Sequence, residues 1–205
     1  SLSALLKPHF TFNLLNTIQA LIVEGKLDEA GVFITKLGQL IRISMENSQE
    51  NFISLEKEIE RIELYLFFEK IRFNKKFSIV ITIDSNINSR SVKLPALILQ
   101  PYVENAIIHG ILHQEGRGEI LIGFSEDNNA LCCTIEDNGI GREKAKQYSS
   151  NLDKEHKSYG VLISKERLDI INKRLEVNFK IEIIDLISEN GEAEGTKVKL
   201  YIPIV

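Results

Sequence analysis

The sequence predicts an α+β protein in which a helical region precedes an α/β sandwich, one β-sheet with helices on one face. Up to residue 75, apolar residues recur at helical spacing. At Lys76 the period becomes alternating, as in a strand. Strand-like and helix-like segments then alternate to the end of the chain. We therefore expect two domains, 1–75 and 76–205, with the boundary at this change of period.

The helical region is predicted to hold three helices. Pro8 suits a first helical turn, and Gly25 breaks the first apolar pattern. A second helix begins near Asp28, a candidate cap, and a third begins at Ser54 and ends near Asn74. The first two should form an antiparallel hairpin, and their apolar stripes need more cover than one hairpin supplies, so we expect a homodimer. The stripes comprise Phe10, Leu14, Ile18, Leu21, Ile22, Ala30, Phe33, Ile34, Leu37, Leu40 and Ile41.

The second region reads as strands around one apolar helix. The helix, 97–110, follows Pro95 and contains Pro101 as an expected kink. The polar segment 142–157 reads as a mobile lid or long loop, followed by a helix over 159–175. Strands are expected at 77–83, 119–124, 130–136, 179–187 and 196–202.

Composition sets limits on function. The 205 residues are 43% hydrophobic and 26% charged, as in ordinary globular proteins. A formal net charge of -4 argues against broad electrostatic binding to nucleic acid. Cys132 and Cys133 are adjacent on an expected strand, so they point to opposite faces and a bridge between them is not expected. No apolar run is long enough to span a bilayer, and a reduced cytosolic setting fits.

Three polar residues interrupt the apolar helix. Asn105 and His109 are four residues apart and share a face, and Glu104 precedes them. Burying a polar group without a partner costs about 1–3 kcal/mol, so these side chains must satisfy each other or meet a ligand. One buried asparagine alone indicates a hydrogen-bonded core cluster. The trio, followed by Gly110 and further glycines, favours a ligand site.

Small residues recur at three places downstream. Asp137–Gly141 ends a strand; its carboxylate can accept a hydrogen bond from an exocyclic amine, and its glycines let the backbone approach a flat ligand or phosphate. A plain Asp-Asn-Gly turn is the alternative. Ser158–Gly160 opens a helix, whose N-terminus favours phosphate. Gly195–Thr196 precedes the last strand and can close a pocket. Their order together predicts a nucleotide site.

This order resembles the Bergerat-fold ATP-binding domain of DNA gyrase, heat-shock chaperones and sensor histidine kinases. Glu104–Asn105 with His109–Gly110 resembles the N box, Asp137–Gly141 the first glycine box, and Ser158–Leu168 the second. Pro8–Asn13 resembles the phosphoacceptor motif of LytS-like sensor histidine kinases. The resemblance covers essentially the whole chain.

The resemblance implies ATP and Mg²⁺ as cofactors. Asn105 would bind magnesium that bridges the ATP phosphates, and oxygen ligands suit this hard cation. Asp137 would receive the adenine amino group, supported by Thr196. A zinc pair formed by His109 and His113 is a rival interpretation, although two ligands make a poor site. The other residues assigned to the nucleotide are His109, Gly110, Gly139, Gly141, Ser158 and Gly160.

The resemblance also makes His9 the phosphate acceptor. A free imidazole titrates near pH ~6.5 and is largely neutral at cytosolic pH. Asn13 lies one turn later and can orient the ring or a phosphate oxygen. Because Phe10 stands where many histidine kinases have an acid, Glu104 is the candidate general base. The ATP domain would swing about a hinge near Lys75–Lys76, and the phosphate would pass to an aspartate of a response regulator.

Two alternatives remain open. The chain could be a nucleotide-binding regulatory module without kinase activity, because Ser158 replaces a glycine and Ile163 a frequent asparagine of the second glycine box. It could also be a Bergerat-fold ATPase in which Glu104 activates water. An abrupt start close to His9 suggests a sensor region upstream. We therefore expect the cytoplasmic part of a bacterial inner-membrane sensor protein.

Overall fold

The structure is a computed structural model that describes residues 8–73, 76–127, 130–148, 172 and 178–203. The chain forms two compact units. Unit 1 comprises Ser1–Lys75 and Ser89–Leu97, and unit 2 comprises Lys76–Asn88 and Ile98–Val205. A break falls at the predicted boundary before Lys76. The chain, however, returns to unit 1 before it finally enters unit 2, which the continuous division 1–75 and 76–205 does not include.

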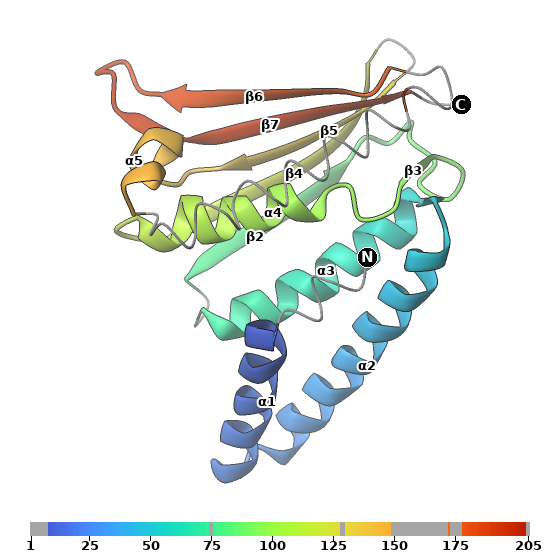
Figure 1. Cartoon of the computed structure of the whole chain (residues 1–205), viewed down its shortest axis with the longest axis vertical. Helices are drawn as coiled ribbons and strands as arrows, with labels where there is room; N and C mark the ends of the chain where they lie inside the picture. The colour runs from blue at the N-terminus through green and yellow to red at the C-terminus, as the bar shows by residue number, and fades with distance from the viewer. Residues whose placement is uncertain (1–7, 74–75, 128–129, 149–171, 173–177, 204–205) are drawn as a thin grey trace. The chain divides into compact units, whose positions relative to one another are not determined.

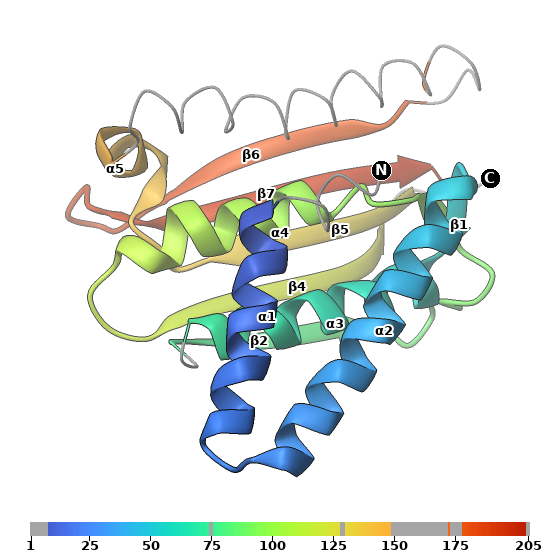
Figure 2. The same cartoon turned by 60° about the horizontal axis from the view of Figure 1, so that its bottom comes forward.

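Unit 1 begins with the predicted helical hairpin. Figure 2 shows α1 (Pro8–Val23) and α2 (Leu27–Gln49) joined by a short turn. Gly25 has a φ of 74° in this turn, a conformation that glycine adopts without steric cost. The prediction that Asp28 caps α2 is wrong. The N-cap is Lys26, which makes no side-chain cap hydrogen bond, and Asp28 lies in the first turn, where its charge complements the helix dipole.

The third helix, α3 (Leu55–Arg72), begins where the sequence predicts. The backbone N–H of Lys57 donates to Oγ of Ser54 over 3.3 Å, which confirms Ser54 as the N-cap. The helix ends slightly earlier than predicted. Just before it, β1 (Phe52–Ser54) pairs antiparallel with β3 (Lys93–Pro95), and this short ladder holds the returning segment in unit 1.

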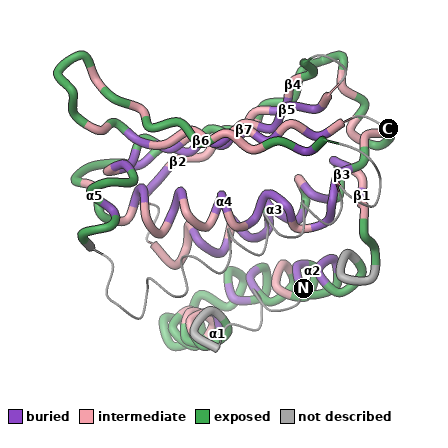
Figure 3. The backbone as a smooth tube through the Cα atoms, turned by 45° about the horizontal axis from the view of Figure 1, so that its top comes forward, coloured by how far each residue is buried: buried purple, intermediate pink, exposed green. Residues whose placement is uncertain are grey.

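Aromatic rings and aliphatic side chains pack together in the core of unit 1. The rings of Phe33 and Phe68 meet edge to face with centroids 4.8 Å apart, and Leu40 is also buried. Figure 3 shows that α1 and α2 nevertheless carry long exposed stretches. Ile34 and Ile41, expected in the buried stripe, are 51% and 44% exposed within the chain. The stripe of α2 is therefore only partly covered by its own chain.

Unit 2 is a five-stranded sheet with strand order β2-β4-β5-β7-β6 (Figure 1). The first pair, β2 and β4, is parallel, and the other neighbours are antiparallel. A helical segment runs along one face of the sheet, which confirms the predicted α/β sandwich. Cys132 and Cys133 are buried in β5, and no disulfide joins them. The strands are β2 (Phe77–Ile83), β4 (Gly118–Asp127), β5 (Ala130–Asp137), β6 (Lys180–Ile187) and β7 (Ala193–Pro203).

The helical segment on the sheet differs from its prediction. It comprises α4 (Gln100–Asn105), a π-helical turn η1 (Ala106–Gly110) and a 3₁₀ turn η2 (Ile111–His113). Pro101 lies in the first turn of α4, where its missing N–H has no helical partner to lose, so the expected kink is wrong. The helix cannot start directly after Pro95 because Leu97 has a φ of 64°. This left-handed conformation costs a non-glycine residue roughly 1–2 kcal/mol.

The segment predicted as a lid or loop over 142–157 begins as a helix instead. Helix α5 spans Gly141–Tyr148, and Ala145 is its buried apolar contact. A single apolar residue gives no periodicity, which is why the sequence reads as a loop. The predicted helix over 159–175 lies outside the described residues, apart from position 172. None of the helices that the structure describes combines the length and apolarity needed to cross a membrane.

Candidate functional site

A cavity of about 220 Å³ lies within unit 2. Its floor and walls come from the strands β5, β6 and β7 on one side and from α4, η1 and α5 on the other. Most of the lining is apolar, which suits a flat, uncharged ring. The lining residues are Tyr102, Asn105, Ala106, His109, Gly110, Ile135, Asp137, Gly141, Arg142, Ala145, Lys146, Ile183, Thr196 and Val198.

Two glycines bring the end of η1 against the loop after β5. The backbone N–H of Ile140 donates to the carbonyl of Gly110 over 3.2 Å. A Cβ on Gly110 would lie 2.5 Å from Oδ1 of Asp137, and a Cβ on Gly139 would overlap the backbone of Gly110. Both positions therefore require glycine for this close approach. The N-box-like and first-glycine-box-like motifs meet here.

Asp137 is the buried carboxylate of the cavity. It is 5% exposed, and the backbone N–H of Gly139 donates to its Oδ1 over 2.9 Å. Burial raises the pKa of Asp137 to about 6, while backbone N–H groups of Gly139 and Thr196 act in the opposite direction. At neutral pH the group is thus a poorly solvated carboxylate that gains from any further donor. The exocyclic amine of a purine supplies such a donor.

The surrounding loop is held in place on both sides. Oδ1 of Asn138 accepts a hydrogen bond of 2.7 Å from the backbone N–H of Glu119 on β4. Gly141, with a φ of 75°, turns the chain into α5. The guanidinium of Arg142 then donates to both carboxylate oxygens of Asp185 on β6, each over 2.6 Å. This bidentate pair fixes the first turn of α5 against the edge of the sheet.

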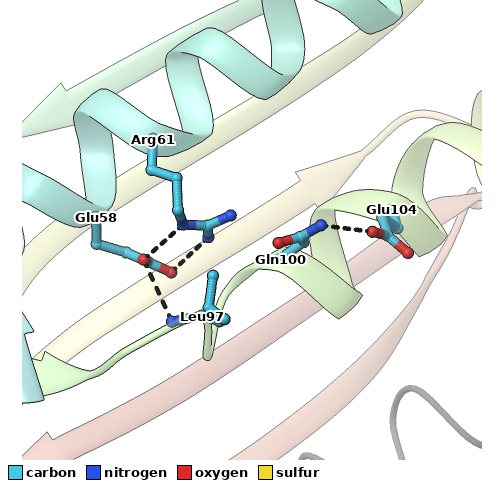
Figure 4. A network of polar contacts seen from close by, with 5 residues as sticks. All are labelled: Glu58, Arg61, Leu97, Gln100 and Glu104. Atoms are coloured by element: carbon cyan, nitrogen blue, oxygen red, sulfur yellow. Dashed lines mark hydrogen bonds and ion pairs between the residues drawn. The ribbon is translucent and has the colours of Figure 1, made fainter. Parts of the chain in front are cut away.

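The three polar residues of the α4–η1 segment do not all line the cavity. Asn105 and His109 are both half-buried and line the cavity. Glu104 does not line it. Nε2 of Gln100 donates to Oε1 of Glu104 over 2.8 Å on another side of α4 (Figure 4). The sequence grouped these residues by proximity, but consecutive helical positions point about 100° apart.

The sequence did not identify several cavity residues. Arg142 and Lys146 were assigned to a lid or loop, and Tyr102 was not assigned to the site. The hydroxyl of Tyr102 is buried and has no hydrogen-bond partner among the described residues, and burial raises its pKa to about 12. Their sequence signal is weak, because only the fold brings α5 beside β6 and β7.

Other predicted site residues lie elsewhere. Thr196 lines the cavity and lies opposite Asp137 in the register of β5 and β7. His9 lies in the first turn of α1, and Asn13 is half-buried one turn further on. His9 belongs to unit 1, whereas the cavity belongs to unit 2. Ser158 and Gly160 lie outside the described residues.

The residues present fit a magnesium-bound adenine nucleotide. The apolar walls suit the base, Asp137 suits its amino group, and the side-chain oxygen of Asn105 is a hard ligand of the kind that Mg²⁺ prefers. A zinc site receives no support, because no group of three or more His, Cys, Asp or Glu within the described part of the chain is arranged to hold a metal ion. His113 itself is exposed.

The chain is similar to known proteins in sequence and in fold. Residues 1–77 match the family described as histidine kinase. The sensor protein LytS of Staphylococcus saprophyticus is 31% identical over 203 residues, which are 99% of this chain and 33% of that protein. The sensor histidine kinase YpdA of Escherichia coli is 34% identical over 141 residues, which are 69% of this chain and 24% of that protein. The chain thus spans a third or less of the length of these relatives.

Solved structures show the same fold. The histidine kinase domain of the blue-light activated histidine kinase EL346 from Erythrobacter litoralis matches 96% of this chain and 96% of its own with a TM-score of 0.51, at 14% sequence identity. Residues 1–77 thus match the histidine kinase family in sequence, and the chain shares its fold with a histidine kinase domain. Within that family, it is a relative of the LytS-type sensor proteins.

Proposed function

We propose that the chain is the kinase core of a two-component sensor histidine kinase. It would transfer the γ-phosphate of ATP to His9 and then to an aspartate of a response regulator. The observation that carries this proposal is the buried carboxylate of Asp137, poised in an apolar cavity that Gly110 and Gly139 shape. It lies in a chain whose helical part matches the histidine kinase family and begins with Pro8-His9-Phe10.

The cavity residues divide the work of nucleotide binding. Asp137 accepts a hydrogen bond from the adenine amino group, and Ile135 and Val198 pack against the ring. The side-chain oxygen of Asn105 is the proposed protein ligand of the magnesium that accompanies the phosphates. His109, on the same side of the segment, is proposed to face the phosphates. When bound, magnesium supplies charge neutralisation for phosphoryl transfer.

The chemistry at His9 needs only a neutral imidazole. The lone pair of one ring nitrogen attacks the γ-phosphorus, an N–P bond forms, and the bond to the β,γ-bridging oxygen breaks to release ADP. The ring then carries a positive charge, which it loses when a base or water takes the proton from the other ring nitrogen, and Asn13 is proposed to orient the ring. Since His9 and the cavity belong to separate units, transfer requires them to approach each other, and positioning supplies much of the catalysis.

The position of Glu104 bears on the alternatives. A Bergerat-type ATPase needs a base that faces the phosphates, but Glu104 is bonded to Gln100 and is absent from the described cavity lining. This disfavours Glu104 as a water-activating base in the cavity. A base for His9 that acts from outside the cavity stays a prediction. The exposed apolar residues of α1 and α2 support a homodimer. A cytoplasmic location beneath a membrane sensor region remains part of this proposal.

Incubation with γ-labelled ATP and magnesium separates the candidate functions. A kinase core retains label on the protein, an ATPase releases free phosphate, and a regulatory module does neither while still binding ATP. Calorimetric titration with ATP must accompany the experiment, because it shows that the cavity is competent. Stoichiometric release of phosphate without labelled protein would overturn the proposal in favour of an ATPase.

A further inference from the structure

A buried ion pair lies on α3, in unit 1. Nε and Nη2 of Arg61 donate to the two carboxylate oxygens of Glu58 over 3.0 and 2.9 Å. Both side chains are almost wholly buried, at 1% and 0% exposed. Two charges withdrawn from water in this way need strong mutual bonding, and such a pair is weak evidence for stability alone. A role in fixing a particular backbone conformation accounts better for its presence.

The carboxylate of Glu58 also accepts a hydrogen bond from a strained position of the backbone. The N–H of Leu97 donates to Oε2 of Glu58 over 3.4 Å, a long bond to a charged and buried acceptor (Figure 4). Within the part of the chain that the structure describes, Leu97 is the one non-glycine residue with a positive φ. A leucine keeps this conformation only when its surroundings hold it there. Glu58, oriented by Arg61, helps to hold Leu97 in this conformation.

Leu97 also occupies a special place in the chain. It is the last residue of unit 1, and Ile98 begins the final passage into unit 2. Gln100, three residues on, begins α4, whose continuation carries Asn105 and His109 to the cavity. Of the links between the units, the one at Leu97–Ile98 leads most directly to the cavity residues. The backbone at Leu97 therefore stands at the junction from which the chain enters α4.

We propose that Glu58 is a positioning residue for phosphoryl transfer: with Arg61, it holds the strained backbone at Leu97 in place and so fixes the conformation with which the chain enters α4. We call this arrangement of Glu58, Arg61 and the Leu97 N–H the clasp. The clasp acts through the backbone and touches neither nucleotide nor His9. It should therefore affect the rate of phosphate transfer and leave nucleotide affinity unchanged. This inference rests on the proposed function for its kinetic consequence and on the structure alone for the clasp.

Two double variants separate the clasp from the ion pair. Glu58→Leu with Arg61→Met replaces the pair by apolar side chains and removes the acceptor for the Leu97 N–H. Glu58→Gln with Arg61→Met removes the same two charges but keeps an oxygen acceptor. Replacement of both partners avoids a lone buried charge, so both variants should fold, as thermal unfolding checks.

The expected results differ in two measurements. Amide hydrogen exchange at Leu97 should be slow in the unmodified protein, at least tenfold faster in the Leu/Met variant, and within about threefold of the original in the Gln/Met variant. The initial rate of His9 labelling should fall at least fivefold in the Leu/Met variant alone. ATP affinity by calorimetry should stay within about twofold in all three proteins, as expected for independent sites in separate units.

Several outcomes would overturn the inference. Fast exchange at Leu97 in the unmodified protein would show that no clasp exists, without any variant. Equal labelling rates in the two variants, or a parallel loss of ATP affinity, would reduce Glu58 to a structural residue. If the unmodified chain took up no label, the proposed function and the kinetic part of this inference would both fail. The exchange comparison would still decide whether Glu58 holds the backbone at Leu97.

Discussion

The hairpin of unit 1 and the sheet of unit 2 differ in how far their apolar side chains are buried. In the central strands, Ile122 and Ile135 are each 1% exposed, because the helical segment covers that face. In the hairpin, Leu15 is 53% and Ile22 51% exposed. The central strands thus complete a core and a cavity within one chain, whereas the hairpin leaves apolar surface uncovered, as does the edge strand β6, where Ile187 is 62% exposed. This difference indicates that unit 2 needs no partner to form its site, whereas unit 1 is built to meet another surface.

The largest effect should come from charging the exposed stripe of α1. Leu15→Glu with Ile22→Glu removes two apolar side chains per chain from the expected dimer interface, each worth about 1.5–3 kcal/mol. Dimer affinity should fall by more than about a hundredfold, and light scattering should report monomers. Asn16→Glu with Ala20→Glu, at exposed positions about 100° or more around the same helix from Leu15, is the matched control and should remain dimeric. An unmodified chain that is monomeric at high concentration would contradict the interface.

Leu14 is unsuited to this test, although it belongs to the predicted stripe. Its side chain is only 5% exposed within its own chain. A charge there would damage the packing of unit 1 itself, so loss of the dimer could not be separated from unfolding. The structure thereby divides the sequence-predicted stripe into residues that serve the fold and residues available to a partner.

The next effect concerns the site in unit 2. Asp137→Asn removes the negative acceptor for the adenine amine and should weaken ATP binding by about 1–3 kcal/mol, roughly ten- to hundredfold. Calorimetry measures the change. Asp127→Asn makes the same chemical substitution at the other end of the β4–β5 pair, where the side chain is exposed, and should bind ATP normally. Equal affinity in the two variants would remove Asp137 from the site.

The raised pKa of Asp137 gives the site a pH dependence. With a folded pKa of about 6, the carboxyl gains a proton as the pH falls below that value and loses its acceptor capacity. ATP affinity should therefore fall about tenfold per pH unit between pH ~6 and ~5. Asp137→Asn carries no such titration, so its affinity curve corrects for protons taken up by ATP itself. Parallel curves for the two proteins would show that Asp137 is not the titrating group.

The free energy of unfolding should depend on pH in the direction opposite to that of ATP affinity. The folded pKa of Asp137 lies above its ordinary value of 3.8, so the folded protein binds the proton more tightly than the unfolded chain. The stability due to this proton is present below about pH 4 and is lost as the pH rises through about 6. Urea unfolding without nucleotide should show this loss in the unmodified chain relative to Asp137→Asn. A difference that does not vary with pH would contradict the raised pKa.

The smallest effect is expected at Tyr102. Because its buried hydroxyl has no partner among the described residues, Tyr102→Phe removes a polar group that gains nothing from burial. The free energy of unfolding, measured in urea, should stay unchanged or rise by up to about 1 kcal/mol. A loss of more than that amount would mean that the hydroxyl is hydrogen-bonded in solution.

The two units also differ in how well their sequences predict them. Regular periodicity predicted α1, α3 and the strands within a few residues, and the Ser54 cap followed from its residue type. The β1–β3 pairing was missed, because three-residue strands carry no measurable alternation. Leu97 was missed for another reason: a positive φ at leucine depends on tertiary contacts, and no sequence signal marks it.

In the candidate site, too, some residues could be predicted from the sequence and others could not. Gly110 and Gly139 could be predicted because close approach of the backbone restricts these positions to glycine, whereas Asp137, Asn105 and His109 were predicted from their spacing and order in the chain. The assignment of Glu104 to the same site did not account for the helical rotation between adjacent residues. Arg142 and Lys146 were hidden in a polar segment whose helix has a single apolar anchor at Ala145. The structure was needed to assign such residues to the cavity.

The most direct test of the account is the effect of His9→Gln on labelling by γ-labelled ATP. Glutamine keeps much of the side-chain shape and removes the nucleophilic nitrogen. The unmodified protein should take up label that is lost in acid and kept in base, as for a phosphoramidate. The variant should take up none, while its ATP affinity stays within about 0.5 kcal/mol because the site lies in the other unit. Acid-stable label, or label that persists in the variant, would show that another residue accepts the phosphate.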